Sequence, residues 1–137
     1  MRAIKFRGKA HGRWVYGGLV YSDNIEPAIY FEVGNKVYKR IDWAYVDPAT
    51  VGQFTGLHDK HGHEIYEGDI LLYNGIRRTV EWKYGTFGLS MHENGFPFQA
   101  FYELLVPIVD STVVGNIYDN FELLKNESNT TKANKAD

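Results

Sequence analysis

The chain has 137 residues, a formal net charge of −2 and no cysteine. This length supports one domain, or two small subdomains that share a core, and the lack of cysteine excludes disulfides, thiolate zinc sites and cysteine nucleophiles. The near-neutral charge excludes the basic field that drives nonspecific nucleic-acid binding. The first residues are charged and no window is apolar enough to span a membrane, so we expect a cytoplasmic protein without a signal peptide.

The N-terminal part carries the patterns of β-strands. Arg2–Arg7 alternates, with Ile4 and Phe6 on one face, as in a half-buried strand. Arg13–Tyr21 is aromatic on both faces around Gly17-Gly18. This predicts a strand that is covered on two sides or bent by a bulge.

A hairpin and a helical turn are expected next. Ala28–Val33 and Lys36–Ile41 flank Gly34-Asn35, which predicts a two-residue hairpin loop because both residues tolerate positive φ. Asp47 as N-cap and Pro48 as first helical residue predict a short helical turn.

The second half predicts further antiparallel strands. His63–Tyr66 and Asp69–Tyr73 are expected to pair, and Asn74-Gly75 is the strongest hairpin signal, followed by a strand over Ile76–Tyr84. A short strand is expected over Thr86–Leu89, and Phe98–Val106 fits either a helix or a strand. A last strand is expected over Thr112–Tyr118, and residues 125–137 are expected to be disordered.

Three sequence blocks follow one another along residues 1 to about 124: MRAIKFRGKAHGRWVYGGLV, VDPATVGQFTGLHDKHGHEIYEGDIL and VVGNIYDNFELL. In this order they resemble the YopX-like family of phage and prophage proteins, and the long middle block makes chance agreement implausible. The resemblance implies a mainly β protein with a small SH3-like barrel in its C-terminal half, and it transfers no catalytic residues. Together with the hairpins, it predicts an N-terminal β-subdomain over residues 1–47 and a barrel over residues 48–124.

A histidine-rich turn holds the one cluster with metal-ligand chemistry. His58, His61 and His63, with Glu64 beside them, could supply ligands to zinc or nickel. The pattern lacks the i, i+4 spacing of a helical zinc motif, and the family more often shows Lys or Asn at these positions. We therefore assign no metal ligand and no cofactor, and keep metal binding as an alternative.

The acids of Tyr66-Glu67-Gly68-Asp69 invite a catalytic interpretation, since paired carboxylates can divide acid and base roles. No serine, histidine or lysine partner can be placed beside them from the sequence. We instead expect Glu67-Gly68 to make a corner and Asp69 to accept hydrogen bonds from turn amides. No catalytic residue is assigned, and the protein is expected not to be an enzyme.

Nucleic-acid binding is a further alternative. The first 13 residues hold five basic side chains and no acid, and three aromatic residues that could stack on bases follow. These residues are Arg2, Lys5, Arg7, Lys9 and Arg13, then Trp14, Tyr16 and Tyr21. The acidic second half of the chain opposes this function because it would repel a phosphate backbone.

The favoured hypothesis is a non-enzymatic phage or prophage accessory protein that forms a homo-oligomer or binds a protein partner. The aromatic strands Trp14–Tyr21 and Ala28–Tyr38 carry more apolar surface than a small sheet can cover internally. Some of that surface is expected to meet another chain.

Overall fold

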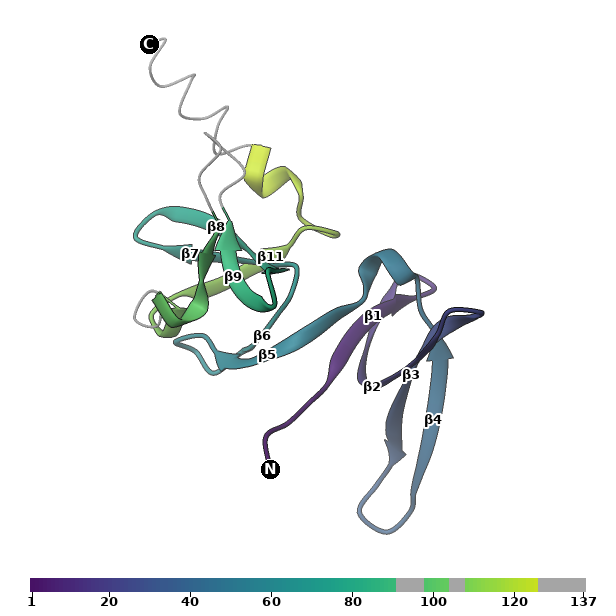
Figure 1. Ribbon diagram of the computed structural model, residues 1–137. Coiled ribbons are helices and arrows are strands. Elements are labelled where there is room, and N and C mark those ends of the chain that lie inside the picture. Colours follow the sequence, from purple (N-terminus) through teal and green to yellow (C-terminus); the bar gives the residue numbers. More distant parts are fainter. Residues whose placement is uncertain (91–97, 104–107, 126–137) are drawn as a thin grey trace. The chain divides into compact units, whose positions relative to one another are not determined.

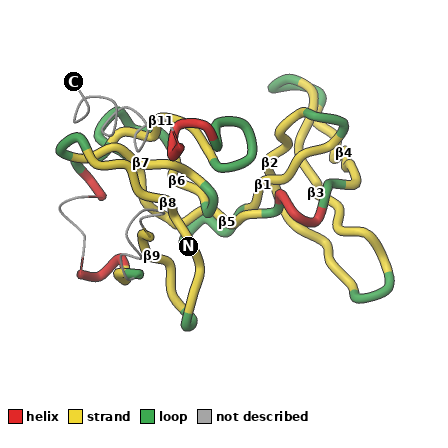
Figure 2. The backbone as a smooth tube through the Cα atoms, turned by 90° about the horizontal axis from the view of Figure 1, so that it is seen from above, coloured by secondary structure: helices red, strands yellow, loops and turns green. Residues whose placement is uncertain are grey.

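The structure is a computed structural model that describes residues 1–90, 98–103 and 108–125. The described residues form antiparallel β-strands with only short helical turns (Figures 1 and 2), which confirms the predicted mainly β fold. None of the described helices is long and apolar enough to cross a membrane. Disorder was predicted for residues 125–137, and of these all but Lys125 lie outside the described residues.

The chain forms two compact units, Met1–Gly56 and Leu57–Asp137. The division into residues 1–47 and 48–124 stays a prediction. In the first unit the strands run in the order β4-β3-β2-β1-β5, and β5 continues into the second unit. These elements are β1 (Phe6–Ala10), β2 (Arg13–Ser22), β3 (Ile25–Gly34), β4 (Lys39–Tyr45), the 3-10 helix η1 (Pro48–Thr50) and β5 (Gly52–His58).

Strand β2 changes partners at its two central glycines. Gly17 pairs with Phe6 of β1, and Gly18 pairs with Tyr30 of β3. A side chain at Gly17 would collide with the carbonyl oxygen of Tyr30, so the close approach of β3 requires glycine there. The register shift itself lies between Val20 and Ser22, after the glycines rather than at them.

The hairpin between β3 and β4 exists, but its predicted two-residue loop is wrong. Gly34 pairs with Lys39, so the loop has four residues and β4 begins three residues later than the predicted strand. Asn35 is the cause, because its Oδ1 accepts hydrogen bonds from the amides of Val37 at 2.9 Å and Tyr38 at 2.8 Å. This side-chain turn replaces the tight backbone turn.

The predicted helical turn at Asp47 is confirmed as η1. The Asp47 carboxylate accepts a hydrogen bond from the Ala49 amide at 3.0 Å, and Pro48 is the first helical residue. The turn is joined to β1, because Thr50 Oγ1 accepts a hydrogen bond from the Lys9 amide at 2.9 Å.

The second unit contains a five-stranded sheet in the order β10-β9-β8-β7-β11. No closed barrel is found among the described residues, so the SH3-like barrel stays a prediction. The buried core of this unit is Ile65, Leu71, Val80, Leu89 and Ile108. The elements are β6 (Glu64–Tyr66), β7 (Asp69–Tyr73), β8 (Ile76–Lys83), β9 (Thr86–Ser90), β10 (Gln99–Ala100), the 3-10 helix η2 (Phe101–Glu103) and β11 (Thr112–Asn116).

Two strand pairings of this unit test the sequence prediction in opposite ways. The Asn74-Gly75 hairpin is confirmed, since Tyr73 pairs with Ile76 and the loop residues have φ of 51° and 76°. The predicted pairing of β6 with β7 is wrong, because β6 lies beside β5 while β7 lies between β8 and β11. The segment predicted as helix or strand begins as β10 and η2, and its residues 104–106 lie outside the described residues.

Candidate functional site

The histidine-rich turn is organised around a buried carboxylate. The Asp59 side chain is fully buried, whereas the His63 side chain is 67% exposed. Asp59 Oδ1 accepts hydrogen bonds from the amides of His61 and His63, both at 2.9 Å, and Oδ2 accepts one from the Val113 amide of β11 at 3.0 Å. The carboxylate therefore fixes the turn and joins it to β11.

The electrostatics of Asp59 follow from these contacts. Burial of the carboxyl group raises its pKa, but three backbone amides and the His63 ring, whose Nδ1 lies 3.2 Å from Oδ2, outweigh that effect. The net result lowers the pKa of Asp59 from 3.8 to about 2. The group stays ionised at neutral pH because its charged form is the one that the amides bind.

The structure does not assemble a metal centre from this turn. The rings of His61 and His63 lie 6.1 Å apart between centroids. Among the described residues, no group of three or more His, Cys, Asp or Glu side chains is arranged to hold a metal ion. The described residues thus show no preformed metal site at His58, His61 and His63, and metal binding stays an untested alternative.

The acidic corner has the structural role that the sequence predicted. Gly68 has a φ of 93° and makes the corner. Asp69 is 2% exposed, and its Oδ2 accepts a hydrogen bond from the Tyr66 amide at 2.7 Å. The corner is fixed further by backbone bonds from Gly68 N to the Val80 carbonyl at 2.8 Å and from Ile117 N to the Gly68 carbonyl at 2.9 Å.

The basic N-terminal residues lie partly inside the first unit. Arg7 is 5% exposed and its guanidinium carbon lies 4.6 Å from the centroid of the Trp14 ring. Lys9 Nζ lies 5.4 Å from the same ring, and Lys5 Nζ lies 5.4 Å from the ring of Phe54. These contacts engage Trp14 and three of the five cations within the unit, which disfavours the predicted stacking surface for nucleic acid.

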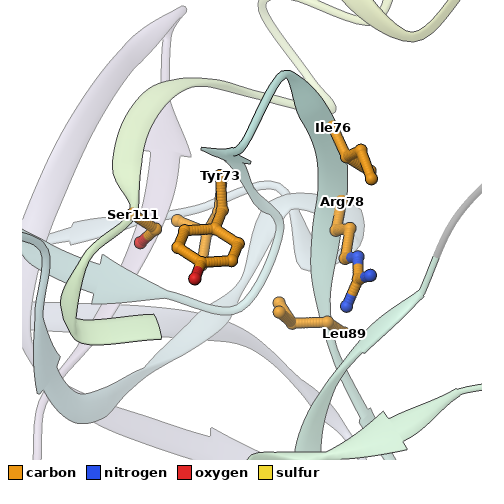
Figure 3. A pocket seen from close by; sticks show the side chains of 6 residues that line it. Tyr73, Ile76, Arg78, Leu89 and Ser111 are labelled. Carbon is orange, nitrogen blue, oxygen red and sulfur yellow. The ribbon is translucent and has the colours of Figure 1, made fainter. Parts of the chain in front are cut away.

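The second unit has a small space between β7, β8 and β9. Its volume is about 10 Å³, which is room for roughly one water molecule and too little for an organic substrate. Figure 3 shows the side chains that line it and labels all of them except Leu71. All six are Leu71, Tyr73, Ile76, Arg78, Leu89 and Ser111.

The strongest candidate site lies on one face of β2, β3 and β4, which pair side by side (Figure 1). Cross-strand register brings five large apolar side chains to this face, all of them well exposed. We call it the aromatic face: Val20 (56% exposed), Tyr30 (38%), Ile41 (62%), Trp43 (46%) and Tyr45 (51%).

The aromatic face is hollowed where small residues sit between large ones. Ala28 pairs with both Val20 and Tyr45, and in the next row Gly18 pairs with Tyr30. Ala28, which lines the hollow, has a short side chain, so space remains above it. The resulting hollow has a volume of about 250 Å³ and is lined by Val20, Ser22, Ile25, Glu26, Ala28, Tyr30, Trp43 and Tyr45.

The sequence prediction found only part of this site. It named the strands that hold Val20 and Tyr30 as excess apolar surface, but it missed Glu26, Trp43 and Tyr45. The alternation of Ile41, Trp43 and Tyr45 was the signal available in the sequence. Glu26 gave no signal, because its place beside the rings depends on the pairing of β3 with β4.

Comparisons with known proteins agree with this architecture. The crystal structure of protein EF1440 from Enterococcus faecalis is similar, with a TM-score of 0.59 and 25% sequence identity, over 90% of this chain and 99% of that chain. Among curated proteins, no sequence matches this chain. The family model described as YopX protein matches residues 5–125. The chain therefore belongs to the YopX family.

Proposed function

We propose that this protein is a non-enzymatic binding module that uses the aromatic face to bind another protein chain, either a second copy of itself or a separate partner. One observation carries the proposal: three aromatic rings and two aliphatic side chains are exposed together on one face of a small sheet. Aromatic residues are enriched in the cores of protein interfaces. Clustered exposed apolar side chains mark such interfaces, whereas isolated ones do not.

The structural roles of two buried carboxylates support a non-enzymatic role. Asp59 and Asp69 hold backbone amides of turns, so their carboxylates serve the fold. The space near Tyr73 holds about one water molecule, which leaves no room for a substrate. We further propose that the protein is encoded in a phage or prophage genome and is located in the bacterial cytoplasm, in line with the sequence blocks described above.

Light scattering tests the proposal with a matched pair of variants. Trp43 on β4 and Trp82 on β8 are 46% and 50% exposed, so Trp43→Ser and Trp82→Ser remove similar rings from different units. We expect wild type and Trp82→Ser to associate at tens of micromolar, and Trp43→Ser to associate about 30-fold more weakly, the loss typical of a central interface tryptophan. Thermal unfolding of each variant shows whether the fold is kept.

The alternatives give different results. A wild-type protein that stays monomeric removes the homo-oligomer version. The partner version is then tested by pull-down from phage-infected cells with Trp43→Ser as control, and equal capture by both proteins would refute it. A gel shift with DNA and RNA at low salt tests the nucleic-acid alternative, and no shift at micromolar protein would end it.

A further inference from the structure

The hollow on the aromatic face combines aromatic walls with a single acidic group. We propose that it binds the guanidinium group of an arginine side chain presented by a protein partner. This inference rests on the protein-binding function proposed above and specifies the chemistry of the partner.

The rings of Tyr30 and Trp43 form a stacked pair, and the ring of Tyr45 meets Trp43 in a T-shaped contact. The rings of Tyr30 and Trp43 are nearly parallel, with centroids 6.1 Å apart and an interplanar angle of 23°. The ring of Tyr45 stands almost perpendicular to Trp43, with centroids 4.9 Å apart and an angle of 80°. All three side chains are partly exposed, so a planar cation can stack on an exposed ring face, and guanidinium groups do so more readily than ammonium groups.

The charge of the hollow favours a cation. Of the described residues that line it, Glu26 alone is charged. Among the described residues, its carboxylate has no hydrogen bond or ion pair. A carboxylate that lines the same hollow as exposed rings can accept the paired N–H groups of a guanidinium while a ring contacts its face.

The size of the hollow fits one side chain. Its volume of about 250 Å³ is below the roughly 300 to 1,000 Å³ of pockets that hold small-molecule ligands. The same unit already contains this kind of contact, because the guanidinium carbon of Arg7 lies 4.6 Å from the centroid of the Trp14 ring. Arginine on tryptophan is thus a contact that this sheet accommodates.

An NMR titration of the full chain tests the inference. The probes are N-acetyl-arginine methylamide, the corresponding lysine compound, and the neutral citrulline compound, which has nearly the same shape as arginine. The indole N–H signal of Trp43, assigned with Trp43→Phe, is expected to shift with the arginine probe. We expect the lysine probe to bind several-fold more weakly and the citrulline probe to cause no shift at the same concentration.

Variants of two glutamates on β3 locate the site. Glu26→Gln is expected to weaken binding of the arginine probe about fivefold, as for an exposed charge pair. Glu32→Gln is the control, because Glu32 is on the same face of β3 but does not line the hollow, and it should bind as wild type does. The dispersion of the amide signals shows that each variant is folded.

Three outcomes overturn the inference: no shift with the arginine probe, equal shifts with citrulline or lysine, or equal weakening by both glutamate variants. Failure here is separable from failure of the proposed function. A protein that associates through Trp43 in light scattering but ignores the arginine probe keeps the binding role and loses only the arginine chemistry.

Discussion

Replacement of Asp59 by asparagine is predicted to destabilise the protein in a pH-dependent way. The fall in pKa from 3.8 to about 2 corresponds to about 2 kcal/mol, because a tenfold change in proton affinity is worth about 1.4 kcal/mol. Asparagine also turns an NH₂ group or a weaker acceptor toward the amides of His61, His63 and Val113. This adds about 1 kcal/mol to the loss of stability. We expect Asp59→Asn to lower the free energy of unfolding by about 3 kcal/mol at pH 7.

The pH dependence follows from the direction of the pKa change. The folded state lowers the pKa of Asp59, so its ionised form stabilises the fold above the unfolded pKa of 3.8. That stabilisation is lost as pH falls from about 4 to about 2, and roughly half of it is gone at pH 3. The stability difference between wild type and Asp59→Asn should therefore shrink by about 1 kcal/mol between pH 6 and pH 3.

Urea unfolding followed by circular dichroism at pH 7, 6 and 3 measures this difference. Asp110→Asn is the control, since Asp110 is an exposed carboxylate of the same unit, and its replacement should change stability by less than about 0.5 kcal/mol. A constant difference between wild type and Asp59→Asn from pH 6 to pH 3 would refute the role assigned to the ionised carboxylate. So would an Asp59→Asn protein as stable as wild type at pH 7.

Three further predictions follow from other contacts. Gly17→Ala should destabilise by more than about 3 kcal/mol because the new methyl group meets the carbonyl oxygen of Tyr30, whereas Gly18→Ala, with open space at its Cβ, should be neutral or slightly stabilising in thermal melts. Equal effects would contradict the partner exchange in β2. Thr79→Val should be neutral or stabilise by about 1 kcal/mol in urea unfolding, because Thr79 is 1% exposed and its hydroxyl has no hydrogen-bond partner among the described residues. A loss of stability above about 1 kcal/mol would show that the hydroxyl does make a hydrogen bond. Zinc added to untagged protein should stay substoichiometric after gel filtration, and one tightly held zinc per chain would reverse the interpretation of the histidine-rich turn.

Local turn chemistry explains which hairpins could be predicted. Asn74-Gly75 was recognised because a two-residue loop demands positive φ at both positions, and these residue types permit it. Gly34-Asn35 gave the same signal and misled, since the Asn35 side chain binds two later amides and opens a longer loop. The dipeptide alone does not show whether the asparagine side chain will bind later backbone amides.

Contacts between residues far apart in the sequence explain which features of the fold and the site could not be predicted. The prediction paired β6 with β7, but β6 lies beside β5 across the turn that Asp59 fixes, and the same carboxylate binds the Val113 amide of β11. The hollow depends in the same way on Ala28 lying between Val20 and Tyr45 across three strands. The role of Asp59 was missed because its third amide comes from Val113, 54 residues later.

The claim that the aromatic face binds another chain is tested most directly by hydroxyl-radical footprinting. Trp43 and Trp82 have similar exposure, 46% and 50%, so they should react alike in dilute, unbound protein. On association or partner binding, we predict that Trp43 and Tyr45 become protected while Trp82 reacts as before. Unchanged reactivity of Trp43 in a sample that light scattering shows to be associated or bound would contradict the account.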